Sequence, residues 1–188
     1  MAEFITKEQF KSSYGRGKSF FNVQIKGLLG KLEQSTKENE IYDVRIFLSH
    51  SHKNKELIFY LVELLKSYRI KVYVDWLDDE LIYPPSGLTA VKIKKMIKEN
   101  KKFIFLATVE AIESKWCNWE LGLGDSEKYI EDIVLFPIAE NNGRWNGNEY
   151  LQIYPYVINQ YKSFLDYRNY YIQYPSGKKV EFVKWLRS

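Results

Sequence analysis

The segment Ser114–Leu121, with the sequence SKWCNWEL, holds the residue types most able to do chemistry. Ser114 is a favoured residue type at a helix N-cap. In a helix that begins after it, Trp116, Cys117 and Glu120 share one face, because residues three and four apart are neighbours on a helix. A carboxylate flanked by two tryptophans is poorly explained by solubility. The pattern therefore favours a functional carboxylate in a crevice.

The same segment allows a different chemistry based on its cysteine. A thiol near a helix N-terminus has a lowered pKa and can act as a nucleophile. The sequence offers His50 as the one evident base for Cys117. A cysteine-dependent hydrolase therefore stays open as an alternative function.

The sequence Ser49–His52, SHSH, is the second group of residues that could take part in chemistry. Two histidines at this spacing could bind a metal, but a zinc site needs three or four ligands, and no CxxC, HExxH or acidic cluster joins them. We therefore expect no metal. A Ser-His hydrolase is also poorly supported, since the chain has no G-x-S-x-G motif. The plain alternative is a polar loop that caps the following helix.

A third polar segment, Asp75–Glu80, has the sequence DWLDDE and is followed by Pro84–Gly87, PPSG. The whole connection is long and acidic, and its Pro and Gly residues restrict or permit particular backbone angles. We therefore expect a shaped surface element here rather than a minimal turn.

These polar segments follow apolar runs that are typical of buried strands. The runs are Val44–Ser49, Lys71–Asp75, Lys102–Val109 and Asp132–Ala139. Helical patterns lie between them, around residues 57–68, 93–97 and 116–128. Apolar strands joined by helices predict an α/β fold with a parallel central sheet flanked by helices on both faces.

In such a fold, ligands bind beyond the carboxyl ends of the strands. The segments that follow the first three strands should therefore line one crevice. They are residues 49–54, 76–89 and 110–120.

The two ends of the chain differ from this central pattern. We expect residues 1–40 to form an N-terminal helical extension, and residues 41–188 to form the α/β domain with a C-terminal helix over Val180–Leu186. A fifth, edge strand is expected near Lys162–Asp166. The extension contains an amphipathic helix, whose apolar face packs on its own domain or on a partner. The residues of that face are Phe21, Ile25, Leu28, Leu29 and Leu32.

Composition limits the compartment and the partners. The chain has 188 residues, 28 basic and 24 acidic, with the two signs interleaved, so nucleic acid is not the expected partner. Cys117 is its single cysteine, which excludes an intrachain disulfide and indicates a reducing compartment. The start lacks the pattern of a signal peptide, and no apolar stretch reaches the ~18 residues of a membrane span. We expect a cytoplasmic protein without a membrane segment.

Two motifs resemble those of a known family. Residues 42–49, YDVRIFLS, are similar to the first strand of TIR (Toll/interleukin-1 receptor) domains, and the pattern SxWCxxEL over residues 114–121 resembles the segment that carries their catalytic glutamate. Residues 73–90 and 145–155 resemble the bacterial TIR branch of the Thoeris antiphage defence system. The resemblance covers about residues 42–165 and implies a flavodoxin-like fold.

The resemblance also implies an activity. Such TIR domains cleave NAD⁺ as substrate, without a further cofactor, and release a cyclic ADP-ribose isomer that activates a separate NAD-consuming effector. Many act only as assemblies, so the resemblance leaves a homo-oligomer open without predicting one. A TIR scaffold without turnover is the alternative function. Glu120 would be the catalytic residue. The implied substrate-binding residues are Ser49, His50, Asp75, Trp76, Trp116 and Cys117.

Overall fold

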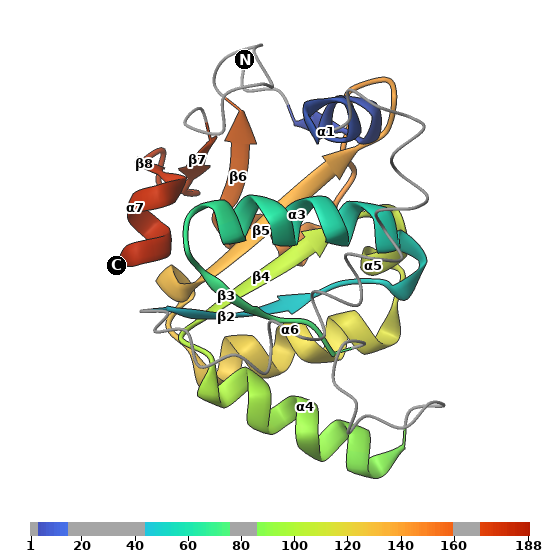
Figure 1. Ribbon diagram of the computed structural model, residues 1–188, viewed down its shortest axis with the longest axis vertical. Helices are drawn as coiled ribbons and strands as arrows, with labels where there is room; N and C mark the ends of the chain where they lie inside the picture. The colour runs from blue at the N-terminus through green and yellow to red at the C-terminus, as the bar shows by residue number, and fades with distance from the viewer. Residues whose placement is uncertain (1–3, 15–43, 76–85, 160–169) are drawn as a thin grey trace.

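The computed structural model describes residues 4–14, 44–75, 86–159 and 170–188 (Figure 1). Four of the sequence-based expectations lie outside these residues. They are the amphipathic helix over residues 21–32, the expected substrate-binding residue Trp76, the shaped surface element over residues 76–85 and the edge strand at residues 162–166.

A mostly parallel sheet forms the centre of the described structure, as the sequence predicts. Strands β3, β2, β4, β5 and β6 follow one another in parallel, and β7 and β8 extend the sheet beyond β6 as antiparallel strands. The short β1 pairs with β5. The strands are β1 (Ile5–Thr6), β2 (Arg45–Ser49), β3 (Lys71–Tyr73), β4 (Lys102–Ala107), β5 (Ile133–Ala139), β6 (Tyr156–Asn159), β7 (Tyr170–Gln173) and β8 (Lys179–Glu181).

Helices cover both faces of the sheet. They are α1 (Lys7–Tyr14), α3 (Lys55–Ser67), α4 (Gly87–Glu99), α5 (Val109–Ile112), α6 (Lys115–Glu127) and α7 (Phe182–Arg187). Short 3₁₀ turns cover His52–Asn54 (η1), Ile130–Asp132 (η3) and Glu149–Ile153 (η4). Within the described ranges, no helix combines the length and the apolar character that crossing a membrane requires.

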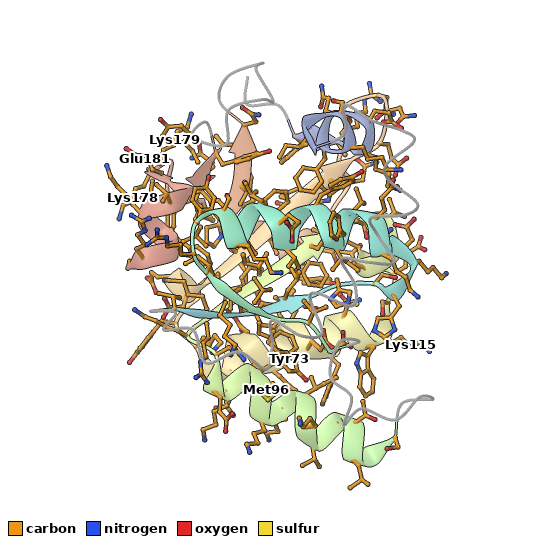
Figure 2. All side chains as sticks on the ribbon, viewed as in Figure 1. Tyr73, Met96, Lys115, Lys178, Lys179 and Glu181 are labelled. Atoms are coloured by element: carbon orange, nitrogen blue, oxygen red, sulfur yellow. The ribbon has the colours of Figure 1, made fainter. Side chains whose placement is uncertain are left out.

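Side-chain alternation along the strands divides the core into two clusters. On β2, Ile46 and Leu48 face the cluster that contains α1, α3 and α7, whereas Phe47 faces the cluster built with α4, α5 and α6. In Figure 1, α3 crosses in front of the strands, and α4 and α6 lie side by side. Tyr73 and Met96, which Figure 2 labels, pack at the edge of the second cluster. Because successive strand residues point to opposite faces, one apolar strand serves both clusters.

The two ends of the chain contribute more to the sheet than the sequence patterns indicate. Residues 4–14, which the sequence analysis placed in the N-terminal extension, add β1 and α1 to the same core, with Ile5 and Phe10 fully buried. At the other end, Val180 pairs with Ile172 in the sheet, and the closing helix begins two residues later, at Phe182.

Candidate active site

The carboxyl ends of β2, β3 and β4 lie at one edge of the sheet. The three strands are adjacent and parallel, so the residues that follow each of them are brought together there. Helix α6 begins at the same edge, where Figure 2 labels its first residue, Lys115. The Ser114 hydroxyl accepts a hydrogen bond from the Cys117 backbone N–H at 3.3 Å, which confirms the predicted helix start.

Glu120 lies in the second turn of α6, where the helix packs against β2. Its side chain is 2% exposed, and it accepts a hydrogen bond of 2.5 Å on Oε2 from the Ser49 hydroxyl at the end of β2. Ser49 itself is 1% exposed. The structure thus joins the two sequence-predicted residues that are 71 positions apart in the chain.

The surroundings of Glu120 oppose its ionisation. Burial, and then the charge of Asp75, raise the pKa of Glu120 to about 8, although hydrogen bonds from Ser49 and Trp116 act in the opposite direction. At neutral pH, the carboxyl group of Glu120 is therefore protonated in most of the molecules. A positive charge brought next to it would favour the carboxylate, which makes Glu120 responsive to a cationic ligand.

Of the two tryptophans of α6, Trp116 interacts with this carboxyl group, and Trp119 packs against Trp116. The rings of Trp116 and Trp119 lie with their centroids 5.0 Å apart at an angle of 40°, and Trp119 is 37% exposed. Because they are three residues apart, they form one aromatic surface on the helix. Such a surface suits a flat heterocyclic ligand, which gains from stacking.

Asp75, just after β3, lies between the two histidines that follow β2. Its Oδ1 is 3.2 Å from His50 Nε2, and its Oδ2 is 3.0 Å from His52 Nε2. The pKa of His50 is lowered by burial, whereas that of His52 is raised because Asp75 accepts its hydrogen bond. The structure therefore brings Ser49, His50 and Asp75 to one edge of the sheet, as expected.

Comparison with known proteins identifies the family. A sequence model of the TIR domain matches residues 46–164. The chain belongs to the TIR domain family. The matched residues contain Ser49, Asp75, Trp116 and Glu120, so the whole site described here lies within the TIR domain.

Two curated relatives carry names that concern a nucleotide product. "Probable 3' cyclic ADP-D-ribose synthase ThsB'" of Bacillus cereus (strain MSX-D12) is 29% identical over 170 residues, which cover 88% of this chain and 86% of that protein. "Putative cyclic ADP-D-ribose synthase TIR2" of Cytobacillus dafuensis is 32% identical over 118 residues, which cover 59% of this chain and 30% of that protein.

Cys117 of this TIR domain is a packed group rather than an activated thiol. It is buried, and its Sγ donates a hydrogen bond to the His50 backbone carbonyl at 3.2 Å. Burial and the nearby Glu120 raise the pKa of Cys117 to about 12, which outweighs the lowering expected from its place at the start of a helix. The thiol is protonated at neutral pH, which argues against the cysteine-dependent hydrolase.

The sequence predicts no role for some polar groups at this edge of the TIR sheet. His52 belongs to the SHSH motif, but it is not among the predicted substrate-binding residues. Thr108, at the end of β4, donates a hydrogen bond to Asn54 at 2.7 Å, and Asn54 donates to Glu110 at 3.1 Å. The one feature of the sequence that indicates these residues is their position soon after a strand. Every residue after a strand shares this feature, so it does not separate the functional residues from the others.

Proposed function

We propose that this TIR domain protein cleaves NAD⁺ at the nicotinamide–ribose bond and releases a cyclic ADP-ribose isomer, a nucleotide signal that activates a separate effector in antiphage defence. The observation that carries the proposal is Glu120, a buried carboxyl group held by Ser49 next to Trp116 at the ligand-binding edge of the sheet. The names of the two relatives support the same chemistry.

The bond to be broken determines what the site must supply. Nicotinamide leaves as a neutral molecule, because the positive charge on its ring nitrogen is cancelled by the electron pair of the broken bond. No general acid is therefore needed. The ribose carbon that remains is cationic, and a carboxylate next to it stabilises this oxocarbenium-like centre. Glu120 takes this role, and its burial strengthens the interaction because water is excluded.

Ionisation of Glu120 is coupled to the arrival of the substrate. The oxidised nicotinamide ring carries a positive charge, so its binding next to Glu120 offsets the effect of Asp75 and favours the carboxylate form. The Ser49 hydroxyl, which donates to Oε2, holds the carboxylate in place. Trp116 offers a stacking surface for the leaving ring.

Ring closure requires a nucleophile from the same ADP-ribose molecule. A hydroxyl oxygen forms the new bond to the cationic ribose carbon and gives its proton to the Glu120 carboxylate. Exclusion of water from a buried site favours this over hydrolysis. The name of the Bacillus cereus relative makes the 3' isomer the product to look for first.

The activity is tested by incubating the purified full chain with NAD⁺, with and without an extract of phage-infected cells. We expect nicotinamide and a cyclic ADP-ribose isomer, separated by chromatography and assigned by mass spectrometry against the authentic isomers. Intact NAD⁺ under both conditions would contradict the proposal.

A TIR scaffold without turnover is the second candidate. It is favoured by two exposed apolar side chains on one turn of α4, Leu88 (76% exposed) and Val91 (69% exposed), which suit a protein contact. A scaffold, however, does not require a buried carboxyl group at the carboxyl ends of the strands. The buried Glu120 therefore supports the enzymatic function more strongly than the exposed side chains of α4 support the scaffold function.

A further inference from the structure

Three potential metal ligands meet at the edge of the sheet next to the proposed catalytic carboxylate. The Nε2 atoms of His50 and His52 lie 3.2 Å and 3.0 Å from the two carboxylate oxygens of Asp75. One ligand atom from each residue lies within 4.8 Å of the other two. The sequence showed only the two histidines as candidates, and the fold supplies the third ligand from the next strand.

The hydrogen bonds of His50 determine which of its nitrogens can bind a metal. Its Nδ1 lies 2.8 Å from the Leu48 carbonyl oxygen, which can only accept, so Nδ1 carries the proton. In the neutral ring, Nε2 then presents a lone pair. This atom is buried and has no hydrogen-bond partner among the residues that the structure describes. A backbone carbonyl that holds the other ring nitrogen is the usual arrangement for a metal-binding histidine.

The His50 lone pair faces an atom that is also an acceptor. Asp75 Oδ1 is 3.2 Å from Nε2, yet the two do not form a hydrogen bond. Two electron-rich atoms at this distance inside a protein call for a positive charge between them. A metal ion bound to both would satisfy the buried nitrogen and neutralise the carboxylate.

We propose that His50, His52 and Asp75 bind a divalent transition-metal ion of the zinc class. Zinc bonds of about 2.0–2.2 Å in tetrahedral geometry place neighbouring ligand atoms roughly 3.3–3.6 Å apart, so the two observed separations, 3.2 Å and 3.0 Å, need to widen by only a few tenths of an ångström. On metal binding, His52 Nε2 gives up the proton that it donates to Asp75. The wider spacing within the cluster closes by a movement of His52, whose side chain is 40% exposed. Two imidazoles and one carboxylate suit zinc better than magnesium or calcium.

The number of protein ligands leaves one coordination position of the metal unfilled. Three protein ligands leave a fourth position for water or for a ligand in the crevice, as in catalytic rather than structural zinc sites. Asp75 is also the carboxylate whose charge acts on Glu120. The proposal is independent of NAD⁺ cleavage, because metal binding is measured without NAD⁺.

The composition of the chain makes the site easy to assign by experiment. The whole sequence contains two histidines and one cysteine, and both histidines are in this cluster. The Cys117 thiol keeps its proton and donates a hydrogen bond to the His50 carbonyl, so it does not act as a metal ligand. Zinc binding at any other place would therefore have to use carboxylates without imidazole or thiolate ligands.

The test uses the full chain without an affinity tag, after dialysis against a chelator. Zn²⁺ is titrated by calorimetry, and the metal that remains after gel filtration is counted by mass spectrometry. We expect one equivalent per chain, a rise in melting temperature with Zn²⁺, and no response to Mg²⁺. His52→Asn should weaken Zn²⁺ binding by about 10–100-fold or more and abolish the rise in melting temperature.

Two further variants complete the test. Asp75→Asn should also lose Zn²⁺ binding, whereas Glu113→Gln, which removes an exposed carboxylate after α5, should bind Zn²⁺ like the unmodified chain. His52 is the decisive position, because its exposed side chain can be replaced without disturbing the core, so a normal melting curve without metal is expected. Absence of binding to the unmodified chain, or unchanged binding by His52→Asn, would overturn the proposal.

Discussion

The carboxyl group of Glu120 differs from the other acidic groups of its helix in its surroundings. Asp125 and Glu127 are exposed on α6, whereas Glu120 is turned into the interior and bonded to Ser49. Burial costs a charged group its hydration, and the Ser49 hydroxyl recovers only part of that loss. The chemistry proposed here therefore depends on this one contact between a strand end and a helix.

Replacing Ser49 by Ala should change the pH dependence of NAD⁺ cleavage. In the unmodified protein, kcat/KM should rise with pH through the pKa of Glu120, about 8, because the carboxylate is the active form. Without the Ser49 hydroxyl the carboxylate loses a donor, so its pKa rises further. We expect the midpoint to move up by roughly one pH unit and kcat/KM at pH 7 to fall about tenfold.

Asp75→Asn is the opposing variant for this measurement. The Asp75 carboxylate raises the pKa of Glu120, so removing it should move the midpoint of the kcat/KM profile to lower pH. Both profiles are measured with a chelator present. Midpoints that do not move, or that move in the same direction in both variants, would show that Glu120 is not the group that titrates.

The buried thiol next to Glu120 gives a second prediction for a single residue. Cys117→Ser should keep most of the NAD⁺ cleavage, because the thiol, with its pKa raised to about 12, is not a nucleophile but a packed donor to the His50 carbonyl. A hydroxyl can make the same hydrogen bond. Steady-state kinetics compare the two proteins, and a loss of 100-fold or more with a normal melting curve would restore the cysteine-dependent hydrolase.

At the scale of elements, α6 must lie close to the sheet for Glu120 to reach Ser49. Gly124 permits this approach: a Cβ atom there would lie 3.0 Å from the ring of Phe103 on β4. Phe103 is fully buried, so its ring has little room to move. One glycine on the inner face of the helix thus sets the distance between helix and strand.

Gly124→Ala should therefore lower the free energy of unfolding, whereas Gly122→Ala should raise it. At Gly122 no atom lies within 4 Å of an added Cβ, so only the gain in helix propensity, about 0.5–1 kcal/mol, remains. At Gly124 the same gain is opposed by an overpacking cost of about 1–3 kcal/mol. Urea unfolding measures both, and a Gly124→Ala variant as stable as Gly122→Ala would contradict this account of the packing.

The sequence predicts elements well where they are apolar and long. β2, β4 and β5 are buried strands with runs of apolar residues. Helix α3 has a recognisable apolar face, and α6 begins after a recognisable N-cap residue, Ser114. The contact between Ser49 and Glu120 is different, because no local pattern joins residues 71 positions apart. What could be predicted was only that post-strand segments share one edge of a parallel sheet. The close approach of His50 to Asp75 depends on side-chain rotamers, which a sequence pattern does not contain.

At the scale of the whole molecule, the first described residues belong to the core. β1 has only two residues, too few to show a strand pattern, and its position against β5 depends on contacts with the far end of the sequence. The antiparallel strands β7 and β8 are likewise short, and their tyrosines and charged residues obscure the alternation expected of strands. Both ends of the fold are therefore defined by tertiary contacts.

Phe10→Ala should strongly destabilise the protein. Phe10 is fully buried, and its ring contacts those of Tyr60 and Phe136 at centroid distances of 6.1 Å and 5.5 Å. Truncation of a buried phenylalanine costs about 3–5 kcal/mol. For a chain of this size, that lowers the melting temperature by about 6–20 °C.

The adjacent Lys11 provides the matched control. It forms an ion pair with Glu56 near the surface, and such a pair contributes about 0–1 kcal/mol. Lys11→Ala should therefore melt close to the unmodified protein. Equal melting temperatures for Phe10→Ala and Lys11→Ala would show that residues 4–14 do not belong to the core.

The rate of nicotinamide release by Glu120→Gln tests the central claim most directly. This change keeps the size of the side chain and removes the charge that faces the developing cation. In an assay where the unmodified protein is active, we expect a loss of about 10²–10³-fold in rate. Glu127→Gln, the same change on the exposed side of α6, should keep the full rate. Glu120→Gln that releases nicotinamide at the rate of the unmodified protein would contradict the assignment of Glu120 as the catalytic residue.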